Sequence, residues 1–256
     1  MVQPPPRTAL TGPALVRLLA RIGETDVQAS PQPLADRLSH WLGWTDAIAL
    51  STVLSAPAPA VGGPAGTPAR SDGEDEAQRC LSLRSALAKA IVTDGVLAPP
   101  RPSTRDARHA RGQQAQEVPE MPADYAVFRQ CYLALQQKME ADIGDLRTRL
   151  RNRLAAQSSA MAKLAALDAL MERSLAVRER TLLGAVPGLL GKYFERLRKA
   201  AQASEAQAEA ETEAPTNSNS GAWLTTFRKD MQSLLLAELD VRFQPVEGLL
   251  AALRAR

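Results

Sequence analysis

The sequence predicts an all-α protein, with a small N-terminal helical segment plus a long-helix antiparallel bundle or coiled coil, joined by disordered linkers. Aromatic residues make up 4% of the 256 residues, and β-branched residues are sparse beside the strong helix formers alanine, leucine, arginine, glutamine and glutamate. The hydrophobic fraction of 45% is large enough to build a core. Beyond residue 122, apolar residues recur at steps of three and four, which is typical of helices with one buried face.

Residues 1–54 are expected to form three short helices, each with a start or stop signal. Pro13 suits the first turn of one helix, and Gly23 ends it. Ser30 opens the second helix, and Thr45 caps the third. The apolar residues at helical spacing are Leu15, Leu18, Leu19 and Ile22, then Leu34, Leu38, Trp41 and Leu42, then Ile48, Leu50, Val53 and Leu54. This segment is therefore predicted to be a small helical unit.

Two segments poor in helix-forming pattern follow in the chain. Residues 55–71 are a linker rich in proline and glycine, which prevent helix and ladder formation. Residues 99–122 are a second linker, rich in arginine and proline. Both are predicted to be disordered. Between them, residues 72–98 are predicted to form a single helix, which Asp72 caps and which is apolar along one side.

Residues 123–256 are predicted to form a bundle of long helices. The apolar stripe of the first helix is Tyr125, Phe128, Tyr132, Leu135, Met139, Ile143, Leu146, Leu150 and Leu154. A short turn at residues 157–159 makes the second helix antiparallel to the first. The stripe of the second helix is Met161, Leu164, Leu167, Met171, Leu175 and Leu182.

Glycine and proline are expected to interrupt the second long helix, because Gly184, Pro187 and Gly188 follow its stripe. Residues near 204–221 turn acidic and are predicted to be a disordered loop. The last helix is expected to begin near Trp223. Its stripe is Phe227, Met231, Leu235, Leu239, Phe243, Val246, Leu250 and Leu253, and Pro245 is expected to bend it.

Two tryptophans are the first candidate binding residues. Trp41 and Trp44 flank Leu42 and Gly43 where the second helix ends. Tryptophan dominates the binding energy of many interfaces, so the pair is a candidate anchor for a protein partner. The alternative, which we favour on sequence grounds, is that both side chains complete the core of a small three-helix unit.

Four arginines are the second candidate. Arg147, Arg149, Arg151 and Arg153 alternate with leucines, and on a helix they form two i,i+4 pairs beside the apolar stripe. Such a cluster could contact phosphate or an acidic partner. The alternative, which we favour, is that their stems cover the helix seam while their charged ends stay in water. The net charge of +3 is too small to indicate non-specific nucleic-acid binding.

Residue types that carry chemistry are scarce. The chain has two cysteines, Cys80 and Cys131, and two histidines, His40 and His109, and no cluster among them has metal-ligand spacing. No phosphate-binding or hydrolase motif occurs. We therefore expect no enzymatic activity, cofactor, metal, disulfide or small-molecule substrate. No apolar run reaches the length of a membrane span, and no signal peptide is evident, so we expect a cytoplasmic protein.

Five strings in the sequence resemble, in this order, an uncharacterised proteobacterial family of unknown function, catalogued as domain of unknown function number 3348. They are RTALTGPALVRLLARIG, DRLSHWLGWTDAIALS, YAVFRQCYLALQQKMEADIGDLRTRLR, ALDALMERSLAVRERTLL and FRKDMQSLLLAELDVRFQPVEGLLAAL. The resemblance spans most of the chain and carries over no activity and no site residue. Its members are often encoded near a large coiled-coil membrane protein with a proton-channel-like region and near an OmpA-like protein. The resemblance thus implies an accessory subunit of an envelope-linked complex, held at the inner membrane by its partner.

The leading hypothesis is a non-enzymatic helical interaction or scaffold protein. Long apolar stripes without catalytic chemistry favour it, with a protein partner or a second copy completing part of a stripe. The alternative is a nucleic-acid-associated protein that uses Arg147, Arg149, Arg151 and Arg153, although we expect no specific nucleic-acid binding.

Overall fold

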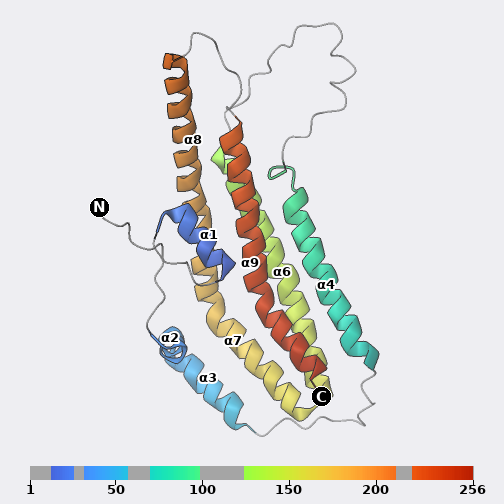
Figure 1. The fold of residues 1–256 in the computed structure, drawn as a ribbon. Helices are drawn as coiled ribbons and strands as arrows, with labels where there is room; N and C mark the ends of the chain where they lie inside the picture. The colour runs from blue at the N-terminus through green and yellow to red at the C-terminus, as the bar shows by residue number, and fades with distance from the viewer. Residues whose placement is uncertain (1–12, 26–31, 57–69, 99–123, 212–220, 256) are drawn as a thin grey trace, which may run out of the picture.

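The computed structural model describes residues 13–25, 32–56, 70–98, 124–211 and 221–255. The chain forms helices and no strand within these residues (Figure 1), which confirms the all-α prediction. The helices are α1 (Ala14–Gly23), α2 (Leu34–Trp41), α3 (Trp44–Ser55), α4 (Arg70–Thr93), α6 (Tyr125–Gln157), α7 (Ser159–Gly184), α8 (Val186–Glu211) and α9 (Ala222–Arg254).

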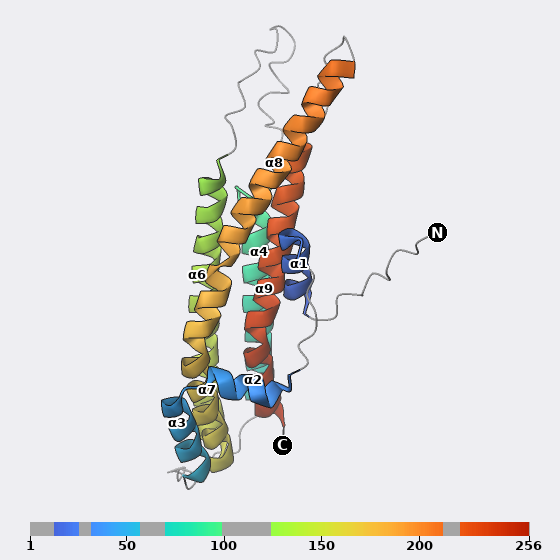
Figure 2. The same ribbon diagram turned by 90° about the vertical axis from the view of Figure 1, so that its left-hand side faces the viewer.

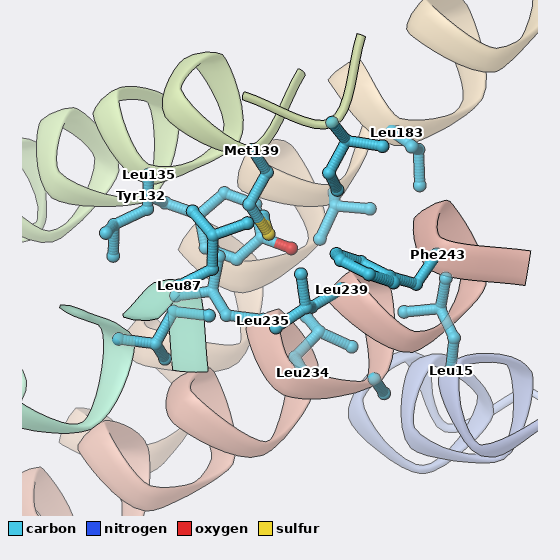
Figure 3. Close-up of a cluster of buried hydrophobic side chains, with 14 of the residues drawn as sticks. Leu15, Leu87, Tyr132, Leu135, Met139, Leu183, Leu234, Leu235, Leu239 and Phe243 are labelled. Atoms are coloured by element: carbon cyan, nitrogen blue, oxygen red, sulfur yellow. The ribbon is translucent and has the colours of Figure 1, made fainter. Parts of the chain in front are cut away.

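The core lies between α6 and α9, with α4 on one side and with α7 and α8 on the other (Figure 1). The predicted stripes of α6 and α9 are buried apart from Tyr125 and Leu250, which are half-buried. Figure 3 shows this core, in which Met139 and Tyr132 lie close to leucines of α9 and α4. Burying one such side chain contributes about 1.5–3 kcal/mol, so these two stripes supply much of the stability of the fold.

The stripe predicted for α7 is only partly correct. Leu164 and Leu182 are exposed, whereas Ala165, Leu170 and Leu183 are buried. The physical reason is that α7 packs against α6 on one side and against α3 on another. A helix that is covered on two sides has no single apolar stripe, and the periodicity of its sequence is blurred.

The connections between the long helices are short. Ser158 ends α6 and caps α7, because its hydroxyl accepts a hydrogen bond from the Met161 N–H over 3.2 Å. The predicted break between α7 and α8 is a single residue, Ala185. There α8 lies close to the start of α6: the Tyr125 hydroxyl donates to the Pro187 carbonyl oxygen.

The three N-terminal helices lie against different parts of the long helices (Figure 2). Helix α1 packs on α8 and α9, and α3 packs along α7. Polar contacts help to hold α1: Arg21 pairs with Asp230 over 2.5 Å, and Arg196 donates to the Ile22 carbonyl oxygen over 2.6 Å and pairs with Glu24 over 3.0 Å. Helix α1 therefore buries Leu15, Ala20 and Ile22, whereas no described residue of α2 or α3 is fully buried, and Ile48 and Leu54 of the stripe predicted for α3 are exposed. Helix α4 packs against α6 and α9.

Some features predicted from the sequence differ from those of the structure. The acidic loop predicted near 204–221 is wrong at its beginning, because α8 continues to Glu211, and the alanine-rich sequence there favours helix. Pro245 lies inside α9 and does not interrupt it. Residues 57–69, 99–123 and 212–220 contain most of the predicted linkers and lie outside the described residues. Among the helices that the structure describes, none is long and apolar enough to cross a membrane.

Candidate functional site

The turn between α2 and α3 places the two tryptophans in different environments. The Gly43 N–H donates to Asp46 Oδ2 over 3.2 Å, which closes the first turn of α3. Trp41 is half-buried, and the guanidinium groups of Arg37 and Arg178 lie over its ring, at 5.3 and 5.0 Å from the ring centroid. These are cation–π distances. Trp41 thus helps to attach the turn to α7.

Trp44 points away from the protein and is 82% exposed. The expectation that both tryptophans complete the core of a small unit is therefore wrong for Trp44. The reason is that α3 packs on α7 and not on α1, so no third helix covers the side on which Trp44 lies.

Polar contacts at both ends hold α3 on α7. Near the start of α3, the Ser174 hydroxyl donates to Asp46 Oδ1 over 2.8 Å. At its end, the Lys163 ammonium group donates to the Leu54 carbonyl oxygen and, over 3.3 Å, to that of Ala56. The two helices therefore run antiparallel, and the rotation of α3 about its axis is fixed.

This rotation leaves an uncharged surface of α3 in solvent. The half-buried residues Asp46, Ala49, Leu50 and Val53 share the face toward α7. The opposite face, which we call the α3 outer face, consists of Trp44, Ala47, Ile48, Ser51 and Ser55, all exposed. Asp46 is the only charged residue of the helix. A helix that is apolar on both faces is typical of a buried one, so the α3 outer face is a candidate binding surface.

Two of the candidate arginines join α6 to α7. Arg147 forms a bidentate pair with Asp168, with nitrogen–oxygen distances of 3.0 and 2.7 Å. Arg151 contacts Asp168 over 3.1 Å and Glu172 over 2.5 Å. Both guanidinium groups are largely buried. The expectation of solvated charged ends is wrong here, because α7 supplies carboxylates that face them.

The other two candidate arginines reach α4. Arg149 binds Glu76 through two nitrogens at 2.8–3.0 Å, and Arg153 lies 3.4 Å from the same carboxylate. Glu76 is buried. The hydrogen bond from Arg149 lowers the pKa of this carboxyl, against the opposing effect of burial. All four arginines are thus paired with carboxylates, which leaves little free charge for phosphate.

A buried carboxylate network lies at the centre of α6 and α9. Glu238 is fully buried among apolar side chains. It accepts hydrogen bonds from the Tyr132 hydroxyl over 2.7 Å, from Gln136 over 3.0 Å and from Arg242 over 2.9 Å. Gln136 also donates to the Leu183 carbonyl oxygen over 3.3 Å. The network therefore ties together α6, α9 and the end of α7.

Sequence reasoning missed this network and the α3 outer face. Glu238 and Arg242 stand four residues apart beside the stripe of α9, and a charged i,i+4 pair at that position was the available signal. The near absence of charge in residues 44–55 was the signal for α3. Neither pattern is specific, because both also occur on ordinary helices.

The cysteines and histidines do not form a reactive site in the described residues. Burial, followed by the hydrogen bond to Asp94 over 3.3 Å, raises the pKa of Cys131 to about 12. Cys80 is buried among core residues, and desolvation raises its pKa as well. His40 is exposed on α2, and His109 lies outside the described residues. A group of residues suited to hold a metal ion is absent from the part of the chain that the structure describes.

Comparison with known proteins finds one family. A family model described as "Protein of unknown function (DUF3348)" matches residues 1–255. No curated protein and no solved structure matches the chain. The family description assigns no activity, so the function has to be argued from the residues of this chain.

Proposed function

We propose that this chain, which belongs to the DUF3348 family along nearly its whole length, is a non-enzymatic helical protein that binds another protein through the α3 outer face. The observation that carries this proposal is the lack of charge on that face, together with the exposure of Trp44. Interfaces are depleted in charged residues at their centre and enriched in tryptophan. A solvent-facing helix normally carries several charges.

The exposed apolar residues of the molecule support the same surface. Of the large apolar side chains that are exposed among the described residues, Trp44 and Ile48 belong to the α3 outer face, and Leu54 lies elsewhere on the same twelve-residue helix. Those on the much longer α4, α6 and α7 are spread more thinly, with two on α4, one on α6 and three on α7. Scattered exposed leucines and valines need no explanation, whereas a local concentration indicates a binding surface.

The scaffold role extends this proposal. The long helices and their inter-helix ion pairs form a firm support that presents α3 to a partner. The resemblance stated from the sequence implies that the partner belongs to an envelope-linked complex with a proton-channel-like coiled-coil membrane protein, and that this partner holds the chain at the inner membrane. Cell fractionation tests this finer version, since the chain should sediment with membranes only when the partner is present.

Nucleic-acid binding is not favoured by the arginines at 147–153. Their pairing with Asp168, Glu172 and Glu76 means that a phosphate would have to displace a carboxylate. Affinity from phosphate contacts depends on the number of free cations. We therefore keep protein binding as the single proposed function.

Affinity purification of the tagged full chain from its native host tests the proposal. Ile48→Lys should remove the captured partner, because it puts a charge into the centre of the interface. The matched control is Val92→Lys on α4, since Val92 is 50% exposed and Ile48 is 52% exposed. The same partner recovered equally with both variants, at unchanged melting temperature, would refute the proposal.

A further inference from the structure

The outward surface of α6 carries a regular row of uncharged residues. Arg149 reaches α4 and Arg147 reaches α7, so the surface between them, opposite the buried Leu150, points away from the core. All residues of the row are exposed except one half-buried glycine. They alternate at steps of three and four, which is the spacing of a coiled-coil seam. We call them the α6 outer row: Val127, Gln130, Ala134, Gln137, Ala141, Gly144 and Thr148.

The glycine in the middle of this row has no role within the single chain. Gly144 lies inside α6, where glycine disfavours the helix relative to alanine. A Cβ atom added to Gly144 would meet nothing within 4 Å, so packing among the described residues does not require a glycine here. Ala141, one turn earlier in the row, is also small. Two small residues on adjacent turns allow the backbone of another helix to approach closely.

Charged residues border the α6 outer row on both sides. By helical spacing, Lys138 and Asp145 lie on the side of Arg149, and Glu140 lies on the side of Arg147. Lys138 pairs only with Asp142 of its own helix, and this pair is largely exposed. Glu140 and Asp145 are exposed and form no ion pair within the described residues. These charges are therefore available to a neighbouring helix.

We propose that the α6 outer row is the contact surface of a symmetric dimer, in which α6 of a second copy lies antiparallel on α6. With a two-fold axis midway between Ala141 and Gly144, each of these residues faces the other in the second copy. In that register Lys138 of each copy lies beside Asp145 of the other. Parallel helices would instead bring Glu140 against Asp145 of the second copy, and like charges disfavour association.

This register overlaps nearly the whole of α6. The axis lies near the middle of Tyr125–Gln157, so about 30 residues of each helix overlap, which is about 45 Å. Helices α4 and α7 lie on either side of α6 (Figure 1), and their edges add to the contact because stable interfaces need about 1,200 Å² or more. The α3 outer face is a different surface, so this inference does not depend on the proposed function.

Sedimentation velocity of the full chain tests the dimer. The wild type should sediment as a dimer that dissociates on dilution. Ala141→Arg should give a monomer, because it places like charges across the two-fold axis. The matched control is Ala203→Arg, at an exposed position on α8, which should leave the dimer intact. A wild-type chain that is monomeric at ~100 µM, or a dimer that Ala141→Arg leaves intact, would overturn the proposal.

A glycine substitution separates dimer contact from folding. Gly144→Gln should weaken the dimer at least about tenfold, because the added side chain prevents close approach. Its melting temperature, measured by circular dichroism where the wild type is monomeric, should not fall, since glutamine favours helix over glycine. Gly248→Gln in α9 is the matched control, because a Cβ there also meets nothing within 4 Å. Equal dissociation constants for Gly144→Gln and the wild type would contradict a close approach at Gly144.

Charge reversal and cross-linking test the direction of the second helix. Asp145→Lys should weaken the dimer, and adding Lys138→Asp should restore it, because opposite charges face each other again. Under mild oxidation, Ala141→Cys should give a disulfide-linked dimer, since the two copies of this position lie near the axis. Ala134→Cys should not, because its two copies are about 25 Å apart along antiparallel helices and adjacent along parallel ones. Cross-linking through Ala134→Cys would overturn the antiparallel arrangement.

The variants also separate this inference from the proposed function. Ile48→Lys should leave the dimer intact, and Ala141→Arg should still capture the partner from the host. A dimer that Ile48→Lys dissociates and Ala141→Arg does not would overturn the α6 contact.

Discussion

The hydroxyl of Tyr132 donates to the carboxylate of Glu238 over 2.7 Å where neither side chain reaches solvent. One residue comes from α6 and the other from α9, and the two are 106 positions apart. A carboxylate in an apolar core is costly unless it is paired and hydrogen-bonded. Only one register of α6 against α9 gives Glu238 the tyrosine and Gln136 as partners together, so the network selects that register.

The first prediction concerns the charge of Glu238. Glu238→Gln keeps the shape of the side chain but leaves the largely buried Arg242 with only Glu179 as a carboxylate partner. Removing one member of a buried ion pair typically costs about 3–5 kcal/mol. We expect the free energy of unfolding, measured by urea denaturation, to fall by about 3 kcal/mol.

A matched substitution on the same helix provides the control. Glu247→Gln removes an exposed carboxylate of α9 that pairs with Arg84 over 2.8 Å. Exposed ion pairs contribute about 0–1 kcal/mol to stability. The free energy of unfolding of this variant should therefore lie within about 0.5 kcal/mol of the wild-type value. Equal losses in the two variants would mean that Glu238 does not act as a buried ion.

The second prediction concerns alkaline pH. Burial, with the adjacent Glu238 charge as the next cause, raises the pKa of Tyr132 above its ordinary value. A group whose pKa is raised on folding stabilises the folded state fully below the unfolded pKa of about 10, and this contribution is lost as pH rises further. Tyr132→Phe should therefore cost about 1–2 kcal/mol at pH 7. The gap between the two proteins should therefore stay constant up to about pH 9.5 and close as the pH rises above about 10.

The same measurement on Tyr193→Phe provides a comparison for Tyr132→Phe. Burial, followed by the hydrogen bond to Asp230, raises the pKa of Tyr193 to about 12, and this residue is only partly buried. Its alkaline effect should have the same sign and be smaller. Parallel pH curves for the wild type and Tyr132→Phe would show that the hydroxyl of Tyr132 ionises as it does in the unfolded chain.

The stripes of α6 and α9 could be predicted from the sequence because spacing encodes burial directly when a helix has one covered face. The residues predicted for the core from Phe128 to Leu154 and from Phe227 to Val246 are buried, whereas α7, which lies between α6 and α3, does not meet that condition. Pairing between distant helices could not be predicted, because no local pattern specifies which helix covers which. The attachment of α1 to α8 and α9 depends on contacts such as Arg21 with Asp230, which are 209 positions apart.

The surroundings of the candidate site residues also depend on which helices pack together, which the sequence does not specify. Trp41 and Trp44 were singled out from the sequence, but their difference in exposure depends on where α3 docks. The arginines at 147–153 were identified as a cluster, and only the fold shows Asp168, Glu172 and Glu76 opposite them. Sequence patterns therefore located the charges, whereas the packing of α4 and α7 decided whether they are free.

The third prediction concerns thiol reactivity. The pKa of Cys131 is raised to about 12 because its thiol is desolvated and hydrogen-bonded to Asp94. The thiolate is the reactive form, so it is scarce at about pH 8. Ellman's reagent should label Cys131 and Cys80 at least about tenfold more slowly in the native protein than in ~6 M guanidinium. Rapid native labelling of Cys131, identified by mass spectrometry, would contradict this assignment.

The last prediction concerns the ion pairs between α6 and α7. Arg151→Glu puts a third carboxylate beside Asp168 and Glu172, and we expect a loss of about 1–3 kcal/mol in the free energy of unfolding. Adding Glu172→Arg restores an opposite charge at that position, so the double variant should recover at least half of the loss. Substitutions of residues in direct contact show a coupling energy of about 0.5–3 kcal/mol, whereas the effects of substitutions at distant sites are additive. Arg129→Glu combined with Glu172→Arg is the control and should show no coupling. If Arg151→Glu had the same free energy of unfolding as the wild type, the guanidinium group of Arg151 would be solvated, as the sequence alone predicts.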